Sequence, residues 1–156
     1  MLMVKVKHIA YSSGGNPIIL LSDLQDANVL PIWIGLLEAH AIAIGMQEIQ
    51  VPRPLTHDLF KTVCEELGAR ISRIIISDIQ ENTFLAEVHM QKGKKDLVFD
   101  ARPSDAIALA LRVTAPIFVS DRVAVHMLPI QDLITAGDED EGEDEDAAPV
   151  EKKLLN

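Results

Sequence analysis

The hydrophobic pattern of this chain changes its period several times before about residue 135. Residues 3–11 alternate apolar and polar side chains, which is typical of a strand with one buried face. Residues 35–49 carry apolar side chains at the density of a mostly buried helix. Because strands and helices need these two different periods, a chain that keeps switching between them builds both kinds of element. We therefore predict an α+β fold.

The same patterns locate the individual elements. We predict three main helices, over residues 35–49, 56–67 and 103–113, and a mixed sheet of about six to eight strands. The strand candidates are residues 3–11, 18–21, 29–34, 71–79, 84–90, 97–101 and 116–119, and residues 129–134 are predicted to form a short terminal helix. No long linker interrupts residues 1–135, so this region is predicted to be a single domain.

The charge is distributed unevenly along the chain. Residues 1–135 contain 12 Lys or Arg and 15 Asp or Glu, whereas residues 136–156 contain 2 and 9, so most of the net charge of −10 belongs to the end of the chain. Self-repulsion in the acidic run at residues 137–146 prevents it from burying apolar surface. We predict an acidic disordered tail over residues 136–156. It is either a plain solvated segment or a polyanion that competes with nucleic acid for a basic surface.

Composition and motif content exclude several classes of protein. The single cysteine, Cys64, rules out a disulfide framework and a Cys-based zinc cluster. The longest charge-free stretch, residues 8–22, contains turn residues and is too short for a membrane span. A phosphate-binding glycine loop and a G-x-S-x-G motif are both missing, which removes support for nucleotide-triphosphate, NAD and serine-hydrolase chemistry. We expect a cytoplasmic location and no membrane partner.

Two predicted helix beginnings repeat one small motif. In the runs Arg53-Pro54-Leu55-Thr56-His57-Asp58 and Arg102-Pro103-Ser104-Asp105, an Arg precedes Pro, and a hydroxyl residue and an acid follow. Proline presets φ, and the hydroxyl and the acid accept hydrogen bonds from unpaired amides at the helix N-terminus. This capping account leaves the two arginines unexplained. Arg53 and Arg102 are therefore candidate phosphate-binding residues; alternatively each pairs with an acid such as Asp100 or Glu38.

Three separated segments resemble the bifunctional nuclease domain family. They are Leu30-Pro31-Ile32-Trp33-Ile34-Gly35 with Glu38-Ala39, the first Arg-Pro motif, and the run from Asp100 to Ala110 that contains the second. The resemblance covers about residues 1–135 in order. It implies an α+β domain with a mixed sheet, DNase and RNase activity, and a homo-oligomer, for which we favour a dimer. The acidic tail lies outside the family pattern.

The polar residues of these segments include the chemical types that phosphodiester hydrolysis needs. The reaction requires an activated water, stabilisation of charge on the phosphoryl oxygens and a proton for the leaving oxygen. We select Glu38, His57 and Asp105 as catalytic candidates, with His57 as general acid or base. Consecutive helical residues point about 100° apart, so His57 and Asp58 are not expected to pair with each other. Asp58 is instead a candidate helix cap.

A divalent ion such as Mg²⁺ or Mn²⁺ is a possible cofactor. Glu38 lies on an otherwise apolar helix, where a carboxylate is costly unless it is paired or bound to a metal. It is therefore a candidate metal ligand or base, or alternatively the partner of Arg53 or Arg102 in a buried ion pair. Asp100 and Asp105 could flank the same ion, which makes Glu38, Asp100 and Asp105 the metal candidates. The sequence contains no recognised metal-binding spacing.

Two functions remain. The first is a nuclease that hydrolyses DNA and RNA with low sequence preference. The net charge of −3 over residues 1–135 stands against it, because non-specific nucleic-acid binders usually present a positive surface. The second is a non-catalytic oligomeric binding or regulatory module whose Arg-Pro motifs are structural. We favour the nuclease because of the family resemblance. We expect Trp33 to fill the core rather than to stack on bases.

Overall fold

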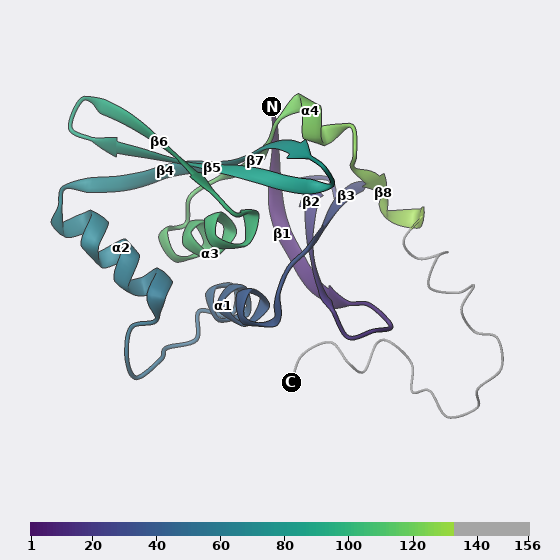
Figure 1. Ribbon diagram of the computed structural model, residues 1–156, viewed down its shortest axis with the longest axis horizontal. Helices are drawn as coiled ribbons and strands as arrows, with labels where there is room; N and C mark the ends of the chain where they lie inside the picture. Colours follow the sequence, from purple (N-terminus) through teal and green to yellow (C-terminus); the bar gives the residue numbers. More distant parts are fainter. Residues whose placement is uncertain (133–156) are drawn as a thin grey trace.

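One sheet organises the domain, with strands in the order β6-β5-β4-β7-β1-β2-β3-β8 (Figure 1). The computed structural model describes residues 1–132. The strands are β1 (Leu2–Tyr11), β2 (Pro17–Asp23), β3 (Asn28–Trp33), β4 (Ala69–Gln80), β5 (Thr83–Lys92), β6 (Lys95–Ala101), β7 (Ile117–Val119) and β8 (Leu128–Pro129). β4 and β7 pair in parallel and the other neighbours pair antiparallel. The sheet is therefore mixed, as predicted.

The short strand β7 joins two antiparallel halves of this sheet. β1, β2 and β3 follow one another along the chain and pair in sequence order, as do β4, β5 and β6. β7 inserts between the halves, with Val4 opposite Ile117 on one side and Ile74 opposite the same residue on the other. β7 comes after the third main helix in the chain. The two halves of the sheet are therefore joined only when this helix has packed against the sheet and the chain has returned to it.

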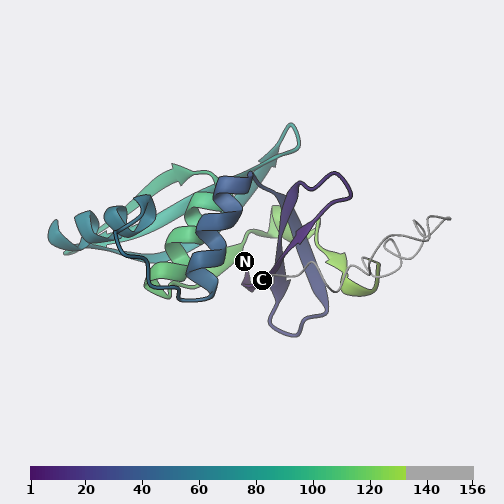
Figure 2. The ribbon, with the colours of Figure 1, turned by 90° about the horizontal axis from the view of Figure 1, so that it is seen from below.

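The three main helices lie in layers on one side of the β4–β5–β6 strands (Figures 1 and 2), and the short fourth helix lies on the other side in Figure 1. The helices are α1 (Leu36–Met46), α2 (Thr56–Glu66), α3 (Pro103–Val113) and α4 (Asp121–Ala124). α3 lies between the strands and α1, which explains why Ala106 to Ala110 are all buried. The stretch is apolar on every side of the helix, which suits a position between two layers. The α+β class and the three main helices are confirmed.

Helix α1 is less buried than its composition predicts. Ala39, Ile42 and Ile44 are buried, but Leu36 and Leu37 are 66% and 83% exposed. The reason is positional: α1 is the outermost layer, so its outer face meets solvent instead of a further element. The prediction of a mostly buried helix was wrong for this face.

The C-terminal part of the described chain differs from the predicted short helix at residues 129–134. Leu128 and Pro129 instead pair with β3 as the edge strand β8, and residues 130–132 are helical. The rest of that predicted helix, the domain end near residue 135 and the acidic tail at 136–156 lie outside the described residues. Among residues 1–132, none of the helices has the length and apolar character that a membrane span requires.

The Arg112 side chain joins the three main helices. It projects from the last turn of α3, is only 6% exposed, and donates from Nε to Asp58 of α2 at 2.6 Å. Its Nη1 donates to the carbonyl oxygens of Ala41 in α1 at 3.1 Å and Ala108 in α3 at 2.8 Å. A buried guanidinium needs such acceptors, since an unpaired buried charge is costly. These bonds therefore restrict how α1 and α2 can pack on α3.

We predict that Arg112→Met lowers the free energy of unfolding by about 3 kcal/mol, because it leaves the Asp58 carboxylate without its cation in a partly buried place. Denaturant unfolding followed by circular dichroism measures this change. Arg122→Met is the matched control: Arg122 is 80% exposed, lies 3.5 Å from Asp78, and should cost no more than about 0.5 kcal/mol. Equal costs for the two variants would contradict the role given to Arg112.

Candidate functional site

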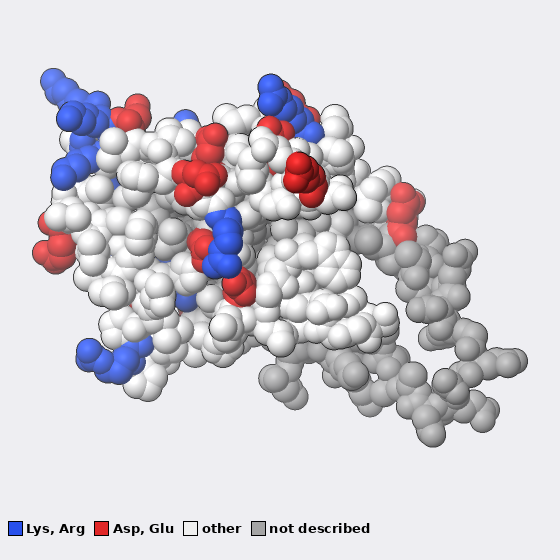
Figure 3. All heavy atoms as spheres, viewed as in Figure 1, with Lys and Arg blue, Asp and Glu red and all other residues white. Residues whose placement is uncertain are grey.

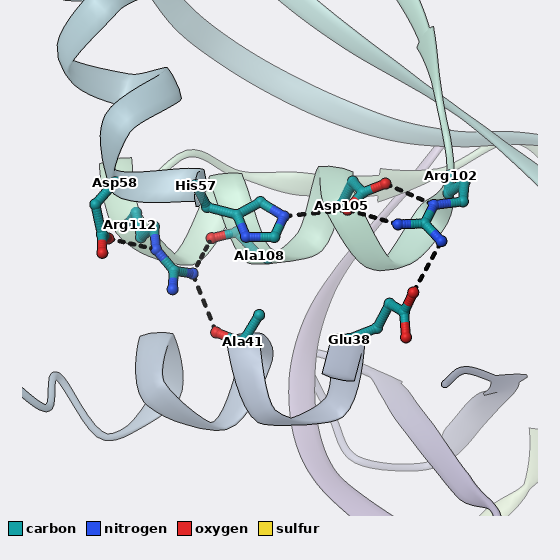
Figure 4. A network of polar contacts seen from close by, with 8 residues as sticks. All are labelled: Glu38, Ala41, His57, Asp58, Arg102, Asp105, Ala108 and Arg112. Carbon is teal, nitrogen blue, oxygen red and sulfur yellow. Dashed lines mark hydrogen bonds and ion pairs between the residues drawn. The ribbon is translucent and has the colours of Figure 1, made fainter. Parts of the chain in front are cut away.

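Four of the residues selected from the sequence form one chain of polar contacts (Figure 4). Arg102 donates from Nε and Nη2 to the two carboxylate oxygens of Asp105, at 2.7 and 3.2 Å. Its Nη1 donates to Glu38 Oε1 at 2.8 Å. His57 Nε2 lies 3.1 Å from Asp105 Oδ1. Glu38, Arg102, Asp105 and His57 are therefore in contact in that order, although 64 residues separate the first pair.

The N-terminal ends of three helices place these side chains. Glu38, His57 and Asp105 belong to the first turns of α1, α2 and α3, and Arg102 is the N-cap of α3. The positive end of a helix dipole favours a nearby carboxylate, which suits the two acids. Gly35, the N-cap of α1, gives Glu38 its position, because a Cβ at residue 35 would overlap the Glu38 carboxylate. A side chain at residue 35 would therefore force the Glu38 carboxylate to move from its place beside Arg102.

His57 and Asp58 point to different partners, as helix geometry predicts. Asp58 Oδ2 accepts from the backbone N–H of Leu55 at 2.8 Å, which confirms the capping role, and its other oxygen accepts from Arg112. The N-cap of α2 is Leu55 and not Thr56, so the cap comes from the acid and not from the hydroxyl. Adjacent residues of one helix thus have different partners: His57 contacts Asp105, and Asp58 contacts Arg112 (Figure 4).

The network is ion-paired yet open to solvent at its centre. The Arg102 side chain is 64% exposed, whereas those of Glu38 and Asp105 are 23% and 32% exposed. Burial raises the pKa of Asp105, but the hydrogen bonds from Arg102 and His57 outweigh it, so the pKa lies below its ordinary value. The ion pair of Glu38 with Arg102, which the sequence offered as one alternative, is present. It is not a dry pair, because the guanidinium remains accessible.

A hollow of about 530 Å³ adjoins Arg102 and Glu38. Its wall also includes Trp33 from the end of β3, and Asn16 and Asn82 from two hairpin turns. Trp33 is 62% exposed, so the expectation that it fills the core was wrong. The strand β3 ends at this residue, so its side chain projects past the elements that would cover it.

The remaining candidates lie apart from this hollow. Asp100 lines a second cavity of about 760 Å³, between α2 and the strands β5 and β6, to which His57 and Asp105 also contribute. Arg53 is exposed in the loop between α1 and α2 and takes no part in the contact chain within residues 1–132. The structure therefore brings Glu38, His57, Arg102 and Asp105 into one contact chain. Asp100 lies outside that chain but shares the second cavity with His57 and Asp105, and Arg53 lies apart from both.

The geometry of the predicted metal ligands does not fit a divalent ion. The Arg102 guanidinium lies between the carboxylates of Glu38 and Asp105 and already supplies their positive partner. Asp100 belongs to the other cavity. Among the described residues, no group of three or more His, Cys, Asp or Glu side chains is arranged to hold a metal. We therefore derive no chemical step through a metal, and the cofactor expectation stays a prediction for the assay described below.

Sequence reasoning missed Arg112 altogether. The available signal was the same one that singled out Glu38, namely one charged residue in an apolar helix, which must find a partner when buried.

The fold and the site define a mixed-sheet α+β domain with an accessible arginine held between carboxylates at helix N-termini. A family model for the bifunctional nuclease domain matches residues 19–128, and the chain belongs to that family.

Relatives from bacteria and plants support this membership. An uncharacterized protein of Mycobacterium tuberculosis is 44% identical over 107 residues, which is 69% of this chain and 63% of that protein. The relative named "Bifunctional nuclease 2" from Arabidopsis thaliana is 29% identical over 99 residues, 62% of this chain and 30% of the relative. "Bifunctional nuclease 1" of Oryza sativa subsp. indica is 25% identical over 108 residues, 66% of this chain and 33% of the relative. The chain thus spans about a third of these plant proteins.

The lowered pKa of Asp105 predicts a pH-dependent contribution to stability. A carboxylate whose folded pKa lies below its unfolded value stabilises the fold above about pH 4 and loses that contribution as the pH falls through the folded pKa. The melting temperature of Asp105→Asn should therefore lie below that of the wild type at neutral pH, and the gap should shrink in acid. Asp96→Asn, which alters an exposed residue of β6, is the control. A gap that does not change with pH would contradict the assignment.

Proposed function

We propose that this domain is a nuclease that hydrolyses phosphodiester bonds of DNA and RNA in the hollow beside Arg102. The observation that carries the proposal is the accessible guanidinium of Arg102, held next to the Glu38 carboxylate at the edge of a cavity. The names of the plant relatives and the family add support. Arg102 binds the phosphoryl oxygens and stabilises the charge that develops on them, while Glu38 accepts a proton from the attacking water.

The hydrogen-bonding capacity of Arg102 permits this without breaking its ion pairs. A guanidinium carries five N–H donors. Three of them are used within residues 1–132, one from each nitrogen, for Asp105 and Glu38. One N–H on each Nη is therefore left to donate to a phosphoryl oxygen. Asp105 acts as a positioning residue, since both of its oxygens orient the guanidinium.

His57 is the candidate for the proton that the leaving oxygen needs. Its Nε2 is held by Asp105, and this leaves Nδ1 as the nitrogen that is not engaged in the contact chain. Because the Asp105 carboxylate accepts from Nε2–H, Nδ1 carries a proton to donate only when the imidazole is protonated. The proposal therefore assigns Glu38 as base, Arg102 as phosphate ligand and Asp105 as positioning residue. His57 lines the neighbouring cavity and not the hollow, so it acts as acid on a leaving oxygen that lies on the far side of Asp105.

We predict that Arg102→Gln and Glu38→Gln each lower cleavage of DNA and RNA about 100-fold, since each removes a group that acts in the transition state. Gly35→Ala should lower it as well, because the new Cβ displaces the Glu38 carboxylate without removing a charge. Rates are measured on single- and double-stranded substrates with protein purified identically for every variant. Arg122→Gln, far along the chain on α4, is the control that excludes contaminating nucleases.

The outcome with a chelator separates two versions of the chemistry. Activity that persists in EDTA supports the metal-free assignment. Activity that EDTA abolishes and Mg²⁺ or Mn²⁺ restores would instead favour the metal hypothesis for Glu38, Asp100 and Asp105. Full activity of Arg102→Gln and Glu38→Gln would refute the site.

A second function, an oligomeric binding or regulatory module, is favoured by the apolar surface of α2 and β6. No residue of α2 is buried, and Phe60, Val63, Leu67 and Phe99, which line one groove, are between 45% and 62% exposed. β6 is an edge strand of the described sheet, so its outer backbone groups are available for pairing. Surfaces of this kind mark interaction sites.

We infer that a second copy of the chain covers this surface. Antiparallel pairing of two β6 strands across a two-fold axis, in the register that sets Lys95 of one copy opposite Asp100 of the other, pairs opposite charges. Figure 3 shows Lys and Arg gathered at the β5–β6 turn, where Lys92, Lys94 and Lys95 lie, which adds positive charge at that end. A dimer is the simplest assembly with this symmetry.

Charged substitutions test the dimer directly. Leu67→Glu and Phe99→Glu should convert a dimer into a monomer in sedimentation velocity experiments, because a buried carboxylate at the interface is unpaired. Val125→Glu, at an equally exposed apolar position beyond α4, should leave the assembly unchanged. A wild-type protein that sediments as a monomer at every concentration would contradict the inference.

A further inference from the structure

Trp33 is an exposed aromatic side chain beside the arginine of the proposed site. It is the one tryptophan of the chain, it is 62% exposed, and it lines the same hollow as Arg102 and Glu38. Exposed indole surface is unfavourable in water, and a single exposed aromatic residue at a cavity that also holds a cation is typical of ligand recognition. The hydrolysis assigned to Arg102 and Glu38 makes no use of this side chain.

Two asparagines on the rim of the hollow add neutral hydrogen-bonding groups. Asn16 lies at the turn between β1 and β2, and Asn82 at the turn between β4 and β5. Both are exposed, and neither side-chain amide is hydrogen-bonded within residues 1–132. An amide offers both a donor and acceptors. The hollow therefore presents a flat apolar surface, a cation and neutral polar groups together.

This combination matches the parts of a nucleotide whose base is not paired. The face of a base stacks on an aromatic side chain, its edge hydrogen-bonds to polar groups, and its phosphate binds a guanidinium. In a duplex both faces of each base are already stacked and its Watson–Crick edge is paired, so the indole has no free base face to contact. The volume of about 530 Å³ lies within the range of sites for small ligands.

We propose that Trp33 stacks on an unpaired nucleobase next to the scissile phosphate, and that the domain therefore selects single-stranded nucleic acid. This inference rests on the proposed nuclease function for the role of Arg102. It adds the substrate class, and it explains how a domain with net negative charge holds a polyanion: affinity comes from stacking and from one local cation, not from a broad basic surface.

The fluorescence of Trp33 tests the contact directly, because no other tryptophan contributes to the emission. The full chain is titrated with an oligothymidylate of about eight nucleotides, with a blunt duplex of equal length and with an abasic strand of equal length. The single strand should quench the emission, whereas the duplex and the abasic strand should not. Quenching by the abasic strand would show that the phosphate backbone alone is responsible and would overturn the proposal.

Variants at position 33 give the second measurement, with fluorescence anisotropy of a dye-labelled strand as the readout. Trp33→Leu should weaken binding of the single strand about tenfold or more and remove the preference over duplex, whereas Trp33→Phe should retain most of it. Leu37→Ala is the matched control, since Leu37 is 83% exposed on the neighbouring helix and does not line the hollow. Circular dichroism confirms that each variant is folded.

The two proposals fail in different ways. Single-strand quenching without cleavage by the purified protein would support the stacking site and refute the nuclease. Equal cleavage of single and double strands by the wild type and Trp33→Leu would refute the stacking site and leave the nuclease in place. If no nucleic acid changes the tryptophan emission but protein concentration does, a second copy covers Trp33. That result would overturn the inference.

Discussion

The buried guanidinium of Arg112 is the constraint on which the arrangement of the helices depends. α1 and α2 belong to no strand pair, so packing places them, mainly against α3 and also against β1, β2 and β4. Arg112 adds a directional requirement to that packing, because its donors must meet Asp58 on one helix and the Ala41 carbonyl on another. Once those bonds form, the beginning of α1 lies next to the beginning of α3, and Glu38 reaches Arg102. The buried arginine at one end of α3 thus helps to place the helices around Arg102 at the other end (Figure 4).

Arg102 is ion-paired and accessible at the same time, so it can still contact a ligand. Its two carboxylate partners hold the guanidinium in one orientation and leave it more than half exposed. The cluster contains two carboxylates and one guanidinium, so it does not attract anions in general. A phosphate therefore binds there only if the rest of the ligand makes further contacts with the protein. Trp33 and the rim asparagines supply contacts of that kind. The acidic character of the domain, which argued against nucleic acid in the sequence, is therefore compatible with a ligand recognised mainly through an unpaired base.

Asp105 stands between two cavities that serve different proposed purposes. One of its partners, Arg102, lines the hollow, and the other, His57, lines the groove between α2 and β6. A second copy bound in the groove would therefore lie close to His57, which contacts Asp105. The family match over residues 19–128 includes the elements from β2 to β6 and α3, which build both cavities.

The sequence by itself determined the elements of this protein, and the tertiary structure decided which side chains meet. Apolar periodicity is a local property, so it located the strands and the three helices, and helix geometry alone separated His57 from Asp58. The Arg-Pro motifs marked helix beginnings because proline and acids act on their own turn. The bulge in β1 between Val6 and His8, the exposure of Trp33 and the role of Arg112 were not predictable in this way. The burial of a side chain and its partners depend on which distant segments of the chain pack against it. The partners of Arg112 on the other two helices, for example, lie 54 and 71 residues away.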